Sequence, residues 1–385
     1  MSMSINGNPL YIKWFKNFSD YIYKFWVRFP QCLFSLCISV AVFLFGTSLR
    51  GEWLHALIHI LRYFGKLNDD FDEPDEVSDA SWENITMESL CLKNLFWYWS
   101  TSLLIGFLIY FSFGGFIHWY FYVHQRDTPE KWKCQPQKWL PPDLERNEIY
   151  VGTLSLICAN SVSSIMACYV ANGGRSAMYQ NITEYPLIWF VLQWPVIFLY
   201  QDYVTYWAHR MYHTPFLYKH FHKLHHRYKQ PTAFSVTAIH PVEIVHIQII
   251  TQAPFIFLVP VNFISFYTIL FYTFYNGIID HSGVDIKAPW WQPWRPDTIF
   301  HDNHHQYFHV NFAFNCYFWD IIHETYRKTD RIYNEDIYYG HGKPIGEANG
   351  TELKAEIEER LTENVKAYRS HNYLLDKSIL DSKMK

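Results

Sequence analysis

The sequence predicts an all-α polytopic membrane protein with about four transmembrane helices, a helical hairpin and a polar, histidine-rich helical cap that holds a di-metal site. Three observations lead to this prediction. Charged residues make up only 18% of the 385 residues and aromatic residues 20%, whereas a soluble domain is usually about a quarter charged. Several apolar runs are long enough to cross a bilayer. Thirteen of the 20 histidines fall between His209 and His309.

The overall composition excludes two classes of protein. A hydrophobic content of 50% excludes a disordered chain, which needs low hydrophobicity and high charge. The net charge of -4, from 36 acidic and 32 basic residues, excludes a purely electrostatic nucleic-acid binder. The seven cysteines show no paired spacing, so buried thiols are expected instead of a disulfide framework.

Four apolar runs are candidate membrane spans, because a helix needs about 20 such residues to cross a bilayer. Residues 32–49 contain no charge, and residues 95–123 form the strongest candidate. Residues 149–171 are diluted by Ser and Asn, so a buried helix of a soluble domain is the alternative for this run. Residues 186–208 lead directly into the histidine cluster.

A fifth apolar stretch, residues 242–279, is interrupted by Pro254, Pro260 and Asn262. Proline breaks helices, and a loop needs polar surroundings, so this stretch fits a helical hairpin that enters and leaves the membrane on one side. Residues 52–64 have apolar residues at spacings of three and four and are expected to form an interfacial helix.

Lys and Arg in the loops predict the orientation of the spans. They gather before the first span and in the 124–148 loop, whereas the 52–93 loop has ten acidic residues. The positive-inside rule then places the N-terminus, the 124–148 loop and everything after the fourth span in the cytosol. Asn84 and Asn181 begin sequons that would face the lumen, and the sequence leaves their glycosylation open.

Three short histidine-rich motifs, called histidine boxes here, are the candidates for metal binding. The first spans His209–His213 with spacing four, and the second and third both read H-x-x-H-H. Such spacings put the imidazoles of a box on one helical face, pointing the same way. Three boxes just after predicted spans favour metal binding over surface or core histidines. The eight box residues are His209, His213, His222, His225, His226, His301, His304 and His305.

Eight imidazoles exceed one coordination shell, so two metals are expected. Cysteine is absent near the boxes, which argues against a thiolate zinc site. All-imidazole ligation leaves iron, copper, nickel and zinc open. A site beside an apolar helix bundle favours redox chemistry on a lipid, and iron with dioxygen uses every part of the arrangement.

The order and placement of the boxes resemble the fatty acid hydroxylase/sterol desaturase superfamily of membrane di-iron oxygenases. The resemblance runs from about Tyr150 to about Tyr326, and it is closest to the sterol C5 desaturases. Four further segments carry it: a Gln-Pro segment at 133–138, the second box with its flanks at 218–226, a His-Pro-x-Glu segment at 240–243 and an extra histidine in 279–283. Trp319-Asp320 also matches the Trp-Asp pair that usually follows the third box.

The resemblance implies a set of residues and cofactors. The eight box residues and His281 would ligand two non-haem irons, with His240 as a possible tenth ligand. The enzyme would use O2 to hydroxylate or desaturate a sterol, or alternatively a fatty acyl or sphingoid lipid. Electrons would come from NAD(P)H, through cytochrome b5 or its reductase. The location implied is the endoplasmic reticulum membrane, with the boxes facing the cytosol. Asp202, Glu243, Asp280 and Asp302 are candidates for orienting the imidazoles.

The resemblance also divides the chain into a basic N-terminus (1–30), a first transmembrane pair with its loops (31–148), a catalytic domain (149–330) and a polar tail (331–385). The chain departs from the family pattern at Asn311–Ala313 and at His323–Thr325. Both departures are expected near the junction of the box helix and the substrate, so they leave the lipid open. The sequence leaves two other functions as alternatives: a polytopic metal-ion transporter and a catalytically silent scaffold.

Overall fold

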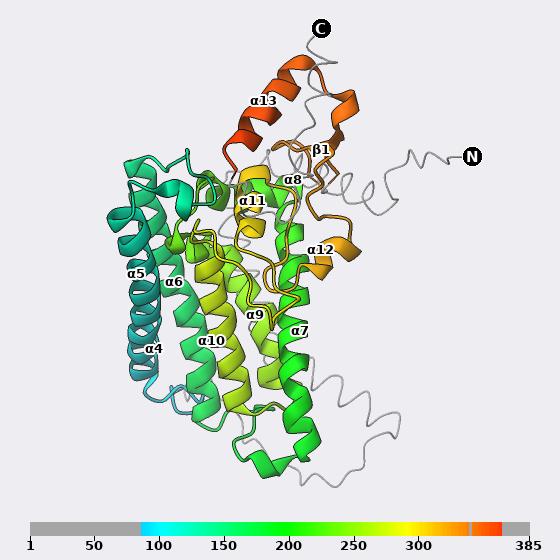
Figure 1. Ribbon diagram of the computed structural model, residues 1–385. Helices are drawn as coiled ribbons and strands as arrows, with labels where there is room; N and C mark the ends of the chain where they lie inside the picture. Colours follow the sequence, from blue (N-terminus) through cyan, green and yellow to red (C-terminus); the bar gives the residue numbers. More distant parts are fainter. Residues whose placement is uncertain (1–85, 339–340, 364–385) are drawn as a thin grey trace, which may run out of the picture.

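A computed structural model of the chain describes residues 86–338 and 341–363 (Figure 1). The predicted first span, the interfacial helix at 52–64 and the sequon at Asn84 lie outside these residues, as does the end of the polar tail from residue 364. Within them, every long element is a helix, and the β structure is one antiparallel pair, β1 (Arg331–Ile332) with β2 (Lys343–Pro344). The prediction of an all-α polytopic membrane protein is confirmed.

Three described helices are long and apolar enough to cross a membrane. The first is continuous over Leu95–His124: α4 (Leu95–Ile109) and α5 (Gly115–Ile117) alternate with two wider turns of π-helix, η2 (Tyr110–Gly114) and η3 (His118–His124). The others are α6 (Pro142–Ala171) and α7 (Leu187–Tyr212). The run at 149–171 is therefore part of a membrane-capable helix that begins at Pro142 and is longer than the sequence predicts.

The predicted hairpin consists of α9 (Pro241–Phe257) and α10 (Phe263–Asp280). The turn between them contains Pro260, and Asn262 begins α10 by accepting a hydrogen bond from the backbone N–H of Ile264 at 3.0 Å. Pro254 lies inside α9 and does not end it, because neighbouring helices can satisfy the carbonyl that a proline leaves free. The helices α4, α6, α7, α9 and α10 lie side by side in one bundle (Figure 1).

Short elements form a cap over one end of this bundle. They include α8 (Pro215–His220), the 3₁₀ helices η6 (His222–Arg227) and η7 (Ala233–Thr237), α11 (Ile299–Tyr307) and α12 (Phe318–Ile322). The helix α13 (Gly350–Leu361) covers the outer side of the cap (Figure 1). The remaining short 3₁₀ turns are η4 (Pro129–Lys131), η5 (Ile182–Glu184) and η8 (Ile345–Glu347).

The C-terminal ends of α7 and α10 and the N-terminal end of α9 meet the cap at the same level. The membrane helices therefore deliver His209, His213 and His281 to the place where η6 and α11 bring the second and third boxes. Large apolar side chains on the outer faces of α4 and α7 are exposed, among them Phe96, Leu108, Leu187 and Val191, as expected for helices that face lipid.

Candidate metal centre

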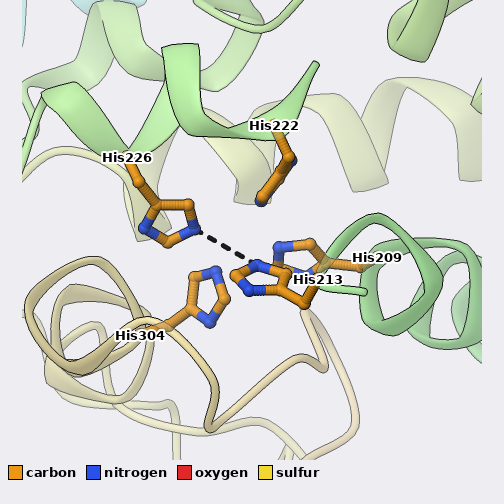
Figure 2. A group of neighbouring side chains, drawn as sticks. All are labelled: His209, His213, His222, His226 and His304. Atoms are coloured by element: carbon orange, nitrogen blue, oxygen red, sulfur yellow. Dashed lines mark hydrogen bonds between the residues drawn. The ribbon is translucent and has the colours of Figure 1, made fainter. Parts of the chain in front are cut away.

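Nine of the ten histidines singled out in the sequence lie in two neighbouring groups in the cap. In each group, one ligand atom per residue lies within 4.8 Å of the others, and all nine side chains are buried. Group one contains His209, His213, His222, His226 and His304. Group two contains His225, His281, His301 and His305. The five rings of group one point toward one another (Figure 2).

The boxes are shared between the two groups. In the second box, His222 and His226 belong to group one and His225 belongs to group two. In the third box, His304 belongs to group one, and His301 and His305 belong to group two. The prediction that each box points its imidazoles the same way is therefore wrong for these two boxes. The second box is a 3₁₀ helix, in which residues three apart lie over one another. His222 and His225 nevertheless belong to different groups, so the local helix type does not decide the grouping.

In group one, an outer partner fixes the ring orientation of four histidines. Nδ1 of His209 donates to the carbonyl of Phe312 at 2.8 Å, and Nδ1 of His304 donates to that of Val310 at 2.6 Å. Nδ1 of His222 donates to the Glu243 carboxylate at 2.6 Å. Nδ1 of His213 lies 2.9 Å from Nδ1 of His309. This pattern leaves Nε2 of each ring to face the centre of the group.

In group two, the outer partners belong to the backbone. Nδ1 of His281 donates to the Gly277 carbonyl at 2.7 Å, and Nδ1 of His225 donates to the Ala238 carbonyl at 3.3 Å. No described residue bonds Nδ1 of His301 or either ring nitrogen of His305. Group two therefore has fewer fixed rings than group one.

The backbone after α11 folds back sharply. It thereby supplies the two carbonyls that accept hydrogen bonds from His209 and His304 of group one. Phe308 and Asn311 have positive φ angles of 63° and 54°, a conformation that costs a non-glycine residue free energy. The Asn311 side chain holds the turn: Nδ2 donates to the Phe300 carbonyl and Oδ1 accepts from the backbone N–H of Arg327. This turn points the Val310 and Phe312 carbonyls at group one.

Burial keeps the imidazoles neutral. It lowers the pKa of His222 to about 3 and that of His281 to about 4. For His213 and His304, burial and the neighbouring histidines hold the pKa well below its usual value. Neutral rings bind a metal without first losing a proton.

The arrangement of the ring nitrogens fits metal ions. Nε2 of His213 lies 3.2 Å from Nε2 of His226, and Nε2 of His281 lies 2.9 Å from Nε2 of His301. Two ligands about 2.1 Å from one ion at right angles are about 3 Å apart. In addition, Nε2 of His209, His222 and His304 is buried without a hydrogen-bond partner among the described residues. Buried polar atoms normally have partners, so these nitrogens mark a place for ions.

Two further histidines have roles outside the two groups. His240 lies outside both groups, where its Nδ1 accepts from the backbone N–H of Val242 and caps α9. The sequence analysis gave no role to His309, yet it holds His213 and donates from Nε2 to the Glu335 carbonyl at 2.9 Å. His309 follows His305 by four residues, the same spacing as in the first box, and this spacing was the signal in the sequence.

Of the four acidic candidates for orienting imidazoles, Glu243 alone contacts one. Asp202 instead accepts hydrogen bonds from Asn315 and Trp319. Asp280 pairs with Arg295, and Asp302 accepts from Gln135 at 2.8 Å. These three carboxylates therefore hold the cap to the bundle, and they do not fix a ring of either group.

A cavity of about 720 Å³ connects the histidines to the bundle. His209, His222, His225 and His281 line its inner end, and α4, α6, α7, α9 and α10 line the rest. Ile105 of α4 and Phe271 of α10 line the cavity and are also about half exposed on the outer surface. The mouth of the cavity therefore opens on the apolar side of the bundle, between α4 and α10.

Both departures from the family pattern lie outside the cavity wall. The backbone N–H groups of Phe312 and Ala313 donate to the Asp320 carboxylate, each at 2.8 Å. His323 packs against Tyr206 and Trp207. Neither segment lines the cavity, whereas Phe314, directly after Ala313, does. The expectation that the two segments lie near the substrate stays a prediction.

The fold and the site together define a class: a helical membrane protein in which two groups of buried, neutral histidines close the inner end of an apolar cavity. Comparisons with known proteins refine it. The family model described as fatty acid hydroxylase matches residues 194–325, which lie inside the predicted catalytic domain. No solved structure gives a significant match.

Three relatives illustrate the similarity. A Delta(7)-sterol 5(6)-desaturase of Gibberella zeae is 24% identical, with 71% of this chain and 74% of the relative covered. A probable Delta(7)-sterol 5(6)-desaturase of Neurospora crassa is 26% identical, with 67% and 71% covered. A C-4 methylsterol oxidase of Schizosaccharomyces pombe is 28% identical, with 61% and 77% covered.

These matches support the resemblance of the chain to the fatty acid hydroxylase/sterol desaturase superfamily. Its relatives are named as desaturases and an oxidase, and this similarity favours a membrane oxidoreductase over a metal transporter or a silent scaffold.

Proposed function

We propose that the chain is a non-haem di-iron enzyme that uses O2 to hydroxylate or desaturate a sterol. The observation that carries this proposal is the cavity that joins four of the clustered histidines to a mouth on the apolar side of the bundle. Both the desaturases and the oxidase among the relatives are named for sterols. A lipid in the bilayer can enter such a mouth without crossing water.

In this proposal, His209, His213, His222, His226 and His304 hold one iron, and His225, His281, His301 and His305 hold the other. Bound iron supplies the activation of O2 that removes hydrogen from an unactivated C–H bond. Glu243 and the backbone carbonyls fix the orientation of the imidazole rings. The apolar helices that line the cavity exclude water from the reacting carbon.

We further propose that electrons come from NAD(P)H through cytochrome b5, with the cap facing the cytosol at the endoplasmic reticulum. The charge of the loops supports this orientation, because Lys and Arg gather at 124–148 and among the boxes. Lys219 and Lys223 lie on the outer cap, where an acidic donor could approach. The division into four segments and the lumenal place of Asn181 rest on the same orientation.

The test combines metal analysis with lipid analysis. Replacing His304 and His305 by Ala removes one ligand from each group. We expect the purified intact chain to carry about two irons and the double variant to carry few or none. In cells, the double variant should lose one oxidised lipid and accumulate its precursor, which names the substrate and the outcome together. His124→Gln, an exposed histidine outside both groups, is the matched control. An iron-free chain with full lipid oxidation would overturn the proposal.

A further inference from the structure

The middle of the cavity contains three glutamines that the histidine site does not use. Gln201 comes from α7, and Gln248 and Gln252 come from α9; all three line the cavity. Gln201 and Gln252 are each only 4% exposed. A buried amide inside a membrane bundle is costly unless it finds a partner, and polar residues there often mark a substrate path.

The hydrogen bonds of these amides are incomplete within the described part of the chain. Nε2 of Gln201 and Oε1 of Gln248 are buried without a partner. Nε2 of Gln248 donates to Ser163 of α6 at 3.0 Å, which fixes that amide. No described residue bonds the Gln252 side chain. Free donors and free acceptors therefore meet in one region of the cavity wall.

Gln201 of α7 lies at the level of the part of α9 that contains Gln248 and Gln252, which are one helical turn apart. The hydroxyl of Tyr200 donates to the Ile250 carbonyl at 3.2 Å, so these parts of α7 and α9 are level. Gln201 precedes His209 by eight residues, or about 12 Å of helix. Gln252 follows Glu243, the partner of His222, by nine residues, or about 13 Å. Gln201 and Gln252 are thus a little over 10 Å along their helices from the level of the histidines, and Gln248 is one turn nearer to them.

The charges of the cavity wall restrict what the glutamines can bind. No Lys or Arg is among the described residues that line the cavity. Its two carboxylates are already engaged, Asp202 with Asn315 and Trp319, and Glu243 with His222. A fatty acid carboxylate or a phosphate would therefore find no counter-charge. A neutral hydroxyl, which both donates and accepts one hydrogen bond, matches amides that offer both.

We propose that Gln201, Gln248 and Gln252 form a subsite, the glutamine subsite, that binds the hydroxyl of a neutral lipid alcohol and thereby sets which carbon reaches the histidines. This inference rests on the proposed function and adds to it a recognition site and a class of lipid. The same charge argument excludes free fatty acids and phospholipids, whose head groups are ionised.

The experiment measures equilibrium binding to the detergent-solubilised full chain. The ligands are a radiolabelled Delta(7)-sterol with its 3-hydroxyl and the same sterol with hydrogen in place of that hydroxyl. The intact chain should bind the alcohol about tenfold more tightly, which is the size of one or two net hydrogen bonds. Gln248→Leu/Gln252→Leu should abolish this preference and leave the affinity for the deoxy sterol within about twofold.

Two controls separate recognition from folding. Gln180→Leu changes an exposed glutamine outside the cavity and should keep the preference. Unchanged binding of the deoxy sterol shows that the double variant retains its cavity. An intact preference in the double variant, or an equal loss for both sterols, overturns the glutamine subsite.

The proposed function can fail separately. If the intact chain binds and oxidises neither sterol, the sterol assignment is wrong. The same comparison with a long-chain alcohol and its alkane then decides the glutamine subsite: a preference that the double variant loses supports it, and the absence of a preference overturns it.

Discussion

The two histidine groups differ in what holds them. In group one, side chains contact the outer ring nitrogens of two histidines: Glu243 accepts from Nδ1 of His222, and Nδ1 of His309 lies next to Nδ1 of His213. In group two, the outer partners of His225 and His281 are the carbonyls of Ala238 and Gly277. A point mutation can therefore loosen group one from outside, whereas group two depends on the path of the backbone and on α10.

The largest effect should come from removing one ligand of each group separately. His213→Ala acts on group one and His281→Ala on group two. Each should lower bound iron from about two to about one per chain and reduce turnover by more than about 100-fold, since a ligand should matter more than its outer partner. Elemental analysis of the purified variants and product formation check this. Loss of both irons in either variant would show that the groups are not independent.

The second prediction concerns the stability of the metal-free chain at low pH. A histidine free in the unfolded chain has a pKa of about 6.5, whereas burial lowers the pKa of His222 to about 3 and that of His281 to about 4. Between these values the unfolded chain binds more protons, so stability should fall as the pH falls from about 6.5 toward 4.

Thermal unfolding of chelator-treated protein at pH 7.5 and 5.5 measures this effect. We expect a lower midpoint at pH 5.5, and a smaller difference when iron is bound, because metal and proton compete for the same nitrogens. Equal midpoints for the metal-free chain at the two pH values would contradict the neutral burial of these rings.

The third prediction tests the side-chain support of group one. Glu243→Gln keeps the shape of the side chain and replaces the carboxyl group that accepts from His222 by an amide. Loss of an outer partner usually costs about 10- to 100-fold in metal affinity or activity. Iron titration of the metal-free protein should show this loss at one site and leave the other unchanged. A uniform weakening of both sites would remove the distinction between the groups.

The smallest effect should follow from His309→Gln. This change removes the ring behind His213 and leaves the nearby Glu335 carbonyl without its partner. We expect less than about a tenfold loss of iron affinity, again in group one, because His213 keeps its place at the end of α7. His220→Gln, next to the second box but outside both groups, serves as the comparison. A loss as large as that of Glu243→Gln would give His309 a greater role than its position indicates.

Much of the fold followed from local sequence. Apolar length predicted the spans that the structure places at Leu95–His124, α6 and α7, and the prolines around residue 260 located the turn of the hairpin. The box spacings selected eight histidines that the structure brings together, and the family resemblance added His281. The predicted span at 32–49 lies outside the described residues.

The division of the histidines into two groups could not be predicted from local sequence. The sequence placed each box on one helical face, but the second and third boxes are each divided between the two groups. The outer partners also come from distant backbone: the carbonyl that holds His209 belongs to Phe312, 103 residues away. Spacing along the chain carries no information on such contacts.

The sequence by itself determined the class of the protein, since the length of apolar runs and the spacing of histidines are local properties that bilayer thickness and helix geometry translate directly into structure. The tertiary structure decided which histidines lie together in a group, which carboxylate contacts a ring, and that three glutamines from two helices line one cavity. These relations depend on how separate helices pack against one another. Gln201 and Gln252 are 51 residues apart in the chain and become neighbours in function only when α7 and α9 align.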